Sequence, residues 1–210
     1  AVGTRRFLVD RLWNGSAFGG SVAPVEGNEA VAGGDADAPD VGPRRDLTGY
    51  AGGNALAAEA LLTLSAYTDD EPAREYAARV LETLDRTFVG DDGVVSHFDA
   101  EADDAPDRLL ADHARVVRAF ATARQVLGPD ALAAERGPLT VARAVADAAI
   151  DGLPEPEGAF RDGPAAGAGL LEEPLRPLDG GVEMAEALLD LAALCAEIDG
   201  GAAADAWRCG

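Results

Sequence analysis

Apolar side chains recur at steps of four and three along residues 109–127, which read LLADHARVVRAFATARQVL. One line of these positions, which includes a histidine, consists of Leu109, His113, Val116, Phe120, Ala123 and Leu127. A second line lies beside it and consists of Leu110, Ala114, Val117 and Ala121. Because an α-helix has about 3.6 residues per turn, the two lines form one broad apolar stripe. The pattern predicts a helix that packs against neighbours on both flanks.

The same periodicity predicts further helices, separated by turns that are rich in glycine, proline and aspartate. They cover residues 3–12, 54–67, 73–88, 139–150 and 182–198, and residues 202–208 are typical of the start of another helix. The turn Thr68-Asp69-Asp70-Glu71-Pro72 supplies an aspartate that can cap the next helix. Residues 94–99 are predicted to be extended, and residues 21–46 to form a long loop, because they lack periodicity.

One segment of the chain repeats. Residues 58–64 read AEALLTL and residues 185–191 read AEALLDL, an offset of 127 residues with the helix of residues 109–127 between them. Each repeating unit is therefore a helix, a short turn, a second helix and a long loop, and it is about half that offset in length. Antiparallel helix hairpins joined in this way form either a superhelical array or an (α/α) toroid.

We therefore predict an all-α fold made of consecutive antiparallel helix hairpins that form a partial (α/α) toroid. Residues 1–210 make one domain, in which residues 1–20 end a preceding hairpin and residues 21–46 are the long loop. Two hairpins follow, and the start of another comes after them. These three parts span residues 47–108, 109–177 and 178–210.

The charge balance excludes several classes of partner. The net charge is −21, and all 17 basic residues are arginines. Without a basic surface, binding to nucleic acid or to an anionic membrane is not expected. A carboxylate surplus of this size favours a salt-adapted cytoplasmic protein, because salt screens the repulsion. Acidic disordered tails fit less well, since 48% of the residues are hydrophobic. The first residue is Ala, so the start is processed or the chain is part of a longer one.

Several motifs together resemble a known family. They are the AEALLxL helix, the T-D-D turn, the Gly-aromatic-Asp turn, the LLADHA helix and the late segment LRPLDGGVEMAEALLDLA. In this order they resemble the C-terminal helical part of thioredoxin-domain-containing proteins of the spermatogenesis-associated type. That part is similar to the six-hairpin toroids of N-acylglucosamine 2-epimerases and related glycosidases. The resemblance covers roughly half of such a toroid, which implies that the rest of its own chain or self-association completes it. It implies no redox activity, because the thioredoxin-like module does not lie in these residues.

In a toroid, the first helices of the hairpins would point their N-terminal ends at a common mouth. Candidate catalytic residues there are His113, Asp112 and His97, because two histidines and a carboxylate suit the proton transfers of a sugar epimerase. Candidate substrate-binding residues supply hydrogen bonds and aromatic surfaces for a sugar. They are Asn54, Asp99, Phe98, Phe160, Arg161, Asp162, Arg176, Asp179 and Glu183, with Trp13 as a further aromatic floor.

Each candidate also has a purely structural interpretation. His113 lies in the apolar seam and His97 alternates with Val95, so these residues could be core and surface histidines. Asn54, Asp112 and Asp179 stand where helix caps are expected, and Glu183 is typical of a solvated first-turn carboxylate. His97-x-Asp99 gives two ligands at most, so no metal is expected, and no cofactor motif is present. Two functions follow: a carbohydrate-active or sugar-binding, epimerase- or glycosidase-like toroid fragment, or a non-catalytic helical scaffold that accompanies a thioredoxin-like module.

Overall fold

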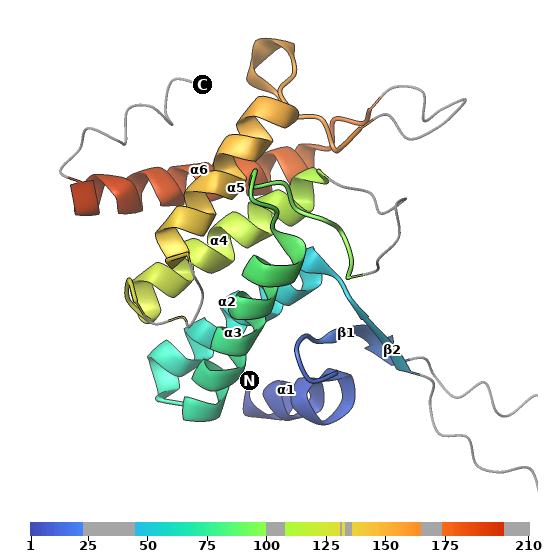
Figure 1. Ribbon diagram of the computed structural model, residues 1–210, viewed down its shortest axis with the longest axis vertical. Coiled ribbons are helices and arrows are strands. Elements are labelled where there is room, and N and C mark those ends of the chain that lie inside the picture. The colour runs from blue at the N-terminus through green and yellow to red at the C-terminus, as the bar shows by residue number, and fades with distance from the viewer. Residues whose placement is uncertain (23–44, 100–107, 131, 133–135, 165–173, 200–210) are drawn as a thin grey trace, which may run out of the picture.

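The computed structural model describes residues 1–22, 45–99, 108–130, 132, 136–164 and 174–199 (Figure 1). The described chain is mostly helical and carries one small two-stranded sheet. Its helices, each close to a predicted stretch, are α1 (Val2–Phe7), α2 (Ala51–Thr68), α3 (Glu71–Thr83), α4 (Leu110–Val126), α5 (Pro138–Gly152) and α6 (Leu178–Asp199). Shorter turns of π- or 3-10 helix are η1 (Leu8–Leu12), η3 (Leu84–Phe88) and η4 (Pro156–Gly158). The expected helix at residues 202–208 lies outside the described residues.

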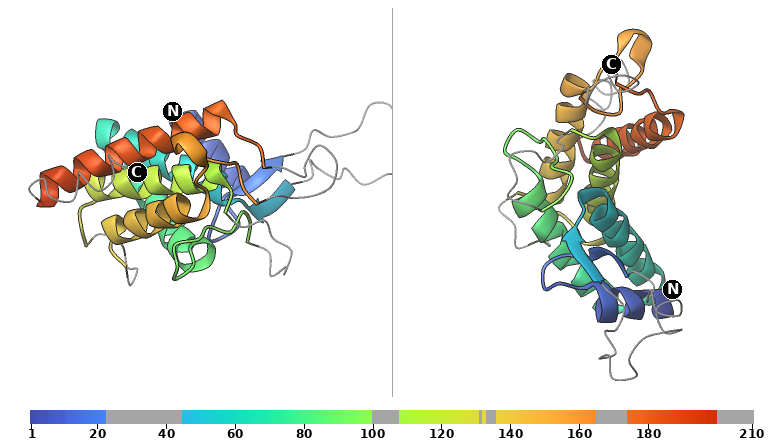
Figure 2. Two further views of the ribbon diagram at one scale, coloured as in Figure 1. Left: turned by 90° about the horizontal axis from the view of Figure 1, so that it is seen from above. Right: turned by 90° about the vertical axis from the view of Figure 1, so that its right-hand side faces the viewer.

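The helices form two layers (Figures 1 and 2). In the first layer α2, α4 and α6 lie side by side, with α4 in the middle and in contact with both neighbours. In the second layer α3 packs against α2, and α5 packs against α4. Arg136, before α5, donates to the carbonyl oxygens of Asp85 and Val89 and so joins α5 to the end of the α3 unit. This arrangement agrees with the predicted hairpins, in which each first helix has a second helix behind it.

The central helix α4 has the environment that its broad stripe predicts. Val116, Val117 and Phe120 are fully buried in one continuous core, together with apolar residues of every other long helix. Arg115 and Arg118 of α4 lie outside this core and form ion pairs with α6 and α2. A helix that is apolar over most of its circumference must be covered on several sides, and α4 is covered by three helices.

A small sheet corrects two predictions, the purely helical fold and the loop at residues 21–46. Strand β1 (Gly19–Val22) pairs antiparallel with β2 (Arg45–Gly49), and residues 23–44 lie outside the described residues. At Gly19 an added Cβ would lie 2.7 Å from the Cα of Leu47, so only glycine permits this close approach of the two strands. Four or five residues rich in glycine and polar side chains give too little alternation to be recognised as strands.

The turn between α2 and α3 forms as predicted. Asp69 ends α2 in the left-handed conformation, with φ 55°. Asp70 caps α3, because its side chain accepts a hydrogen bond from the backbone N–H of Ala73 at 3.0 Å.

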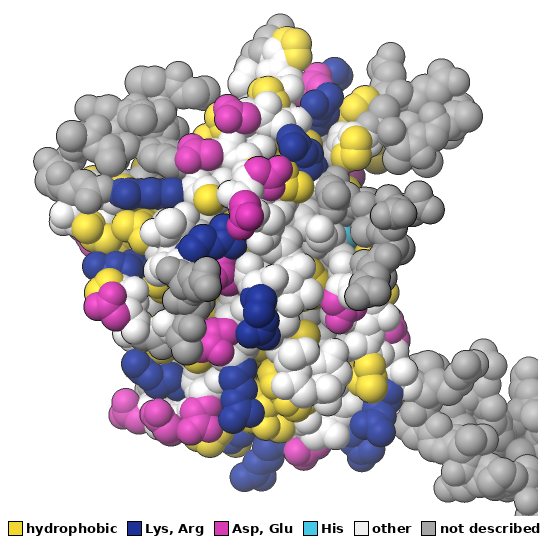
Figure 3. Space-filling model, in the orientation of Figure 1, with side chains coloured by type: hydrophobic (Ala, Val, Ile, Leu, Met, Phe, Trp, Pro, Cys, Tyr) yellow, Lys and Arg dark blue, Asp and Glu magenta, His cyan; other side chains and the backbone are white. Residues whose placement is uncertain are grey.

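Acidic and arginine side chains are interspersed over the face seen in Figure 3. Among the described helices, none combines the length and apolar character needed to cross a membrane.

Candidate functional site

The N-terminal ends of α2, α4 and α6 meet at one end of the first layer. The Oδ1 atom of Asp112, in the first turn of α4, accepts a hydrogen bond from the backbone N–H of Gly52 in α2 at 3.0 Å. Arg115, one turn further along α4, pairs with Glu183 of α6 at 3.1 Å. The predicted convergence of helix ends is therefore present in the described part of the chain. The sequence suggested that Asp112 caps its own helix, α4, but the structure shows no such cap. Asp112 instead binds an N–H group at the start of the neighbouring helix, α2.

A histidine–carboxylate pair lies at this junction. The Nδ1 atom of His97 is 2.7 Å from Oδ2 of Asp112. The carboxylate side chain is 4% exposed, whereas the imidazole is 32% exposed and reaches solvent. Burial raises the pKa of Asp112 above its usual value of 3.8, and the hydrogen bonds from His97 and Gly52 only partly oppose this rise. A buried acceptor on Nδ1 fixes the ring orientation and directs Nε2 to proton exchange.

Two aromatic rings lie beside the partly exposed imidazole. The ring centroids of Tyr50 and Phe98 are 5.4 Å and 5.8 Å from that of His97. Main-chain hydrogen bonds hold this aromatic wall of Tyr50 and Phe98 in place. Tyr50 and Phe98 form an isolated antiparallel bridge, and the N–H of Ala51 donates to the carbonyl of His97 at 2.9 Å. Apolar faces beside a polar group are typical of sugar-binding sites. Sequence analysis missed Tyr50, although an aromatic residue directly before a helix N-terminus was a usable signal.

The second histidine, His113, is fully buried and holds the main chain. Its Nε2 atom accepts a hydrogen bond from the backbone N–H of Val95 at 3.2 Å, and its Nδ1 atom lies 2.9 Å from the carbonyl oxygen of Leu109. Both ring nitrogens thus serve backbone groups, which requires the neutral imidazole with its proton on Nδ1. The geometry favours the structural interpretation of His113. It supports the extended segment of residues 94–99 that carries His97.

Asn54 is not the helix cap that was expected. It lies inside α2, whose N-cap is Tyr50, and it is buried. Its side-chain oxygen accepts from the N–H of Phe18 at 2.8 Å, while its nitrogen donates to the carbonyls of Phe18 and Tyr50, both at 3.0 Å. Asn54 therefore anchors the segment before β1 to α2. Trp13, expected on the sugar-site floor, belongs to this region too, because it packs edge-on against Phe18 and Tyr76.

The acidic candidate residues all have contacts or positions near the N-terminal ends of α2, α4 and α6, which form the mouth of the predicted toroid. Asp99 follows the aromatic wall, and its Oδ1 atom accepts from the N–H of Gly49 at 3.1 Å. Glu183 is at the mouth, but it pairs with Arg115 and is not simply solvated. Asp179 lies in the first turn of α6. Asp162 reaches α4 through its main chain, because its carbonyl accepts from the N–H of Leu110 at 2.7 Å.

The remaining candidates belong to the segment between α5 and α6. Phe160 pairs with Pro154 in an isolated bridge, and Arg161 donates to the carbonyl of Gly152 at 2.8 Å. Arg176 forms an ion pair with Glu155 at 2.7 Å. These contacts fold the segment back on itself, and none of them joins it to His97. No group of three or more potential ligands is placed to hold a metal ion, as far as the described residues go.

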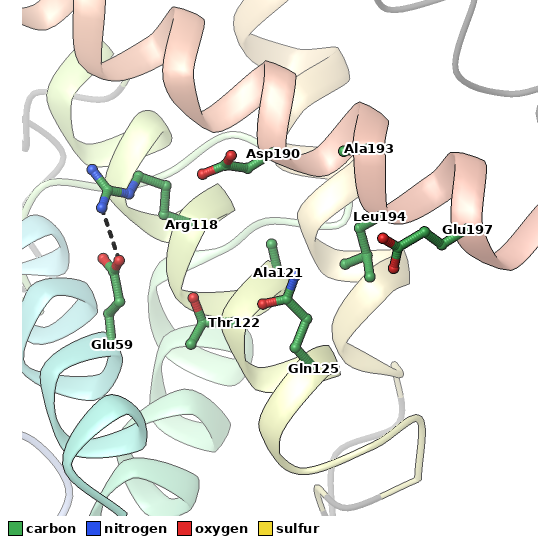
Figure 4. Close-up of a pocket in the computed structure, with 9 residues that line it drawn as sticks. All are labelled: Glu59, Arg118, Ala121, Thr122, Gln125, Asp190, Ala193, Leu194 and Glu197. Atoms are coloured by element: carbon green, nitrogen blue, oxygen red, sulfur yellow. Dashed lines mark hydrogen bonds and ion pairs between the residues drawn. The ribbon is translucent and has the colours of Figure 1, made fainter. Parts of the chain in front are cut away.

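A separate hollow of about 220 Å³ lies further along the first layer (Figure 4). Its lining is mostly polar and comprises Glu59, Arg118, Ala121, Thr122, Gln125, Asp190, Ala193, Leu194 and Glu197. Glu59 and Arg118 point toward one another across the gap between α2 and α4 and are 2.9 Å apart. Arg118 also approaches Glu186 at 3.9 Å. None of the predicted site residues lines this hollow, and it contains no histidine.

Comparison with known proteins places the fold. No family model matches the chain, and no curated protein matches it. Solved structures of similar fold include two whose match covers nearly the whole chain. The Lin0763 protein from Listeria innocua has a TM-score of 0.57 at 15% identity, and the match covers 97% of this chain and 48% of that protein. Cellobiose 2-epimerase from Spirochaeta thermophila has a TM-score of 0.56 at 15% identity, with 98% and 51% covered.

At this identity the likeness shows the fold alone. The chain has the helical-hairpin architecture found in cellobiose 2-epimerase, and it spans about half the length of both solved structures. The predicted similarity to sugar-epimerase folds is thus confirmed at the level of the fold. Neither protein is named as containing a thioredoxin domain, so that part of the resemblance stays a prediction.

Proposed function

We propose that this chain forms part of an (α/α) toroid that binds and processes a sugar, with His97 as the group that exchanges a proton with the substrate. The observation that carries the proposal is the pair of His97 and Asp112 at the junction of three helix ends. In the proposal Nε2 of His97 accepts a proton from the sugar, and Asp112 acts as a positioning residue. The link to thioredoxin-domain-containing proteins of the spermatogenesis-associated type belongs to the same proposal.

Three features support this role for the pair. The imidazole is partly exposed while its carboxylate partner is buried, which is the arrangement a general base needs. Tyr50 and Phe98 lie next to the imidazole and to each other, and they offer apolar faces for a sugar ring. The fold is shared with a cellobiose 2-epimerase, a protein that acts on a sugar by its name. His113 takes no part in proton transfer in this scheme, because the backbone occupies both of its nitrogens.

The test measures proton exchange and binding together. The chain is incubated in D2O with aldoses, ketoses and amino sugars at high salt, and NMR follows deuterium incorporation beside the carbonyl carbon. We expect exchange in at least one sugar and a loss of about 100-fold or more in His97→Asn. Asparagine keeps a donor near the Nδ1 position, so the bond to Asp112 can persist. Glu75→Gln, on an exposed face of α3, is the matched control and should leave exchange unchanged. Absence of exchange, with no thermal shift for any sugar, would overturn the proposal.

The second candidate is a non-catalytic helical scaffold. It is favoured by the number of predicted site residues that are already bonded within the chain, among them Asp99, Arg161 and Arg176. A scaffold would unfold cooperatively, bind no sugar, and be indifferent to His97→Asn. The same exchange experiment therefore separates the two functions.

A further inference from the structure

Helix α6 exposes an apolar stripe along its length. Leu178, Val182, Ala185 and Leu189 follow at steps of four, three and four residues, and all four are exposed. Leu189 is the most informative of them, because it is 61% exposed although it lies in the middle of the helix. Apolar residues at this spacing form one face of a helix, and such a face is normally covered in a folded protein.

The sequence repeat identifies what covers the same face elsewhere in the molecule. At the repeat offset of 127 residues, the stripe corresponds to Ala51, Ala55, Ala58 and Leu62 of α2. All four of these residues are fully buried, in the helix that packs against α3 and α4. Ala58 and Leu62 even match the residue types of Ala185 and Leu189. The exposed face of α6 therefore corresponds to the face of α2 that packs against α3 and α4.

Helix α2 has the complementary free flank. Leu56, which is 45% exposed, and Ala60 are both exposed on α2. Their equivalents in α6 are Glu183, which pairs with Arg115 of α4, and Ala187, which is fully buried. The exposed flank of α2 thus corresponds to the flank with which α6 contacts α4. By this correspondence the free flank of α6 fits a helix that follows it in the first layer, and the free flank of α2 fits a helix that precedes it.

We infer that a second copy of this chain covers both flanks. In this assembly α6 of each copy packs against α2 of the other, so that two identical contacts close a ring of six first-layer helices. Helix α1 with η1 lies beside α3, as the ion pair of Arg5 with Asp70 at 3.1 Å indicates. In the pair, α1 of each copy takes the position behind α6 of the other.

Charge sets the conditions under which this dimer forms. Each copy carries a net charge of −21, and Asp179, Glu186 and Asp190 border the stripe on α6. Bringing two such surfaces together is unfavourable at low ionic strength, where the Debye length is about 30 Å at 0.01 M. Added salt shortens that length to about 3 Å at 1 M and leaves the apolar contact to dominate. The dimer should therefore tighten as salt rises.

The first experiment measures the mass of the full chain by sedimentation equilibrium at 0.01 M and at 1 M salt. Twice the mass of one chain at high salt is the expected result. Leu189→Glu should weaken the dimer by about 100-fold or more, because a carboxylate would be buried at each contact. Leu47→Glu is the matched control, since Leu47 is similarly exposed but lies on β2, away from both flanks. A single-chain mass at every salt and concentration would overturn the inference.

A mixing experiment tests the head-to-tail geometry. Leu189→Glu alone and Leu56→Arg alone each damage both contacts of a two-copy ring. A mixed dimer of the two variants brings the glutamate and the arginine together as an ion pair in one contact and leaves the other contact intact, so mixing should restore association. Failure of the mixture to associate, while the wild type forms dimers, would overturn the ring. The inference rests on the repeat and on exposure, so its failure would leave the proton-exchange test of His97 unaffected.

Discussion

The two histidines of this chain lie within one small region, but their surroundings assign them different tasks. His97 stands on an extended segment, is partly exposed and has one buried acceptor, Asp112. His113 stands on α4, is fully buried and binds two main-chain groups. Since His113 holds the N–H of Val95, two residues before His97 in sequence, the buried histidine supports the segment that presents the exposed one. The comparison shows that the chemistry of an imidazole depends on what occupies its nitrogens.

The largest effect is expected from removing the buried histidine. His113→Ala leaves the N–H of Val95 without its acceptor, removes the side-chain contact to the carbonyl of Leu109 and opens a cavity, so the free energy of unfolding should fall by about 3 kcal/mol. His97→Asn, at the partly exposed site, should cost about 1 kcal/mol or less. Urea unfolding of both variants measures the difference. Equal losses of unfolding free energy in the two variants would contradict the structural role of His113. Proton exchange that depends on His113 and not on His97 would reverse the roles of the two histidines.

An intermediate effect is expected at the helix end that supports Asp112. A Cβ added at Gly52 would lie 2.5 Å from Oδ1 of Asp112, whereas one added at Gly53 meets only the Cβ of Tyr50, at 3.9 Å. Gly52→Ala should therefore displace the carboxylate, lower the free energy of unfolding by about 2 kcal/mol and weaken proton exchange. Gly53→Ala, in the same turn, should raise the free energy of unfolding by about 0.5 kcal/mol.

Thermal and urea unfolding of this glycine pair, with the exchange assay beside them, checks both signs. If the two alanine variants behave alike, the contact between Asp112 and the start of α2 contributes nothing to the site.

The smallest effect concerns pH. Burial raises the pKa of Asp112 above its unfolded value near 3.8, so between the two values the folded protein binds more protons than the unfolded one. Stability then falls as pH rises through this interval, and the loss is complete above the folded pKa. Relative to Asp112→Asn, which has no carboxyl proton to lose, the wild type should therefore become less stable as pH rises from 4 to 7. A constant difference between the two proteins over this interval would contradict the raised pKa.

Periodicity in the sequence was enough to locate the helices. The stripe of residues 109–127 became α4, and the Asp70 cap formed at its expected position. The repeat of residues 58–64 at 185–191 correctly indicated two equivalent helices, α2 and α6, on either side of α4. These features are local or repeated, so they can be recognised without knowledge of long-range contacts.

Contacts between distant residues could not be found in this way. Asn54 looked like a cap, yet it lies inside α2 and binds Phe18, which is 36 residues away. The β1–β2 hairpin was missed because its pairing partners are separated by residues 23–44. Tyr50 gained importance only when residues 94–99 were placed against it.

The sequence by itself determined where each helix runs, which face of it is apolar, and which two helices repeat one another. Only the tertiary structure decided which histidine is exposed, what Asp112 binds, and which copy of the repeated face is covered. The physical reason is the range of the interactions. Helix periodicity follows from neighbours about 3.6 residues apart, whereas the surroundings of His97, Asp112 and Leu189 depend on packing between segments distant in the chain.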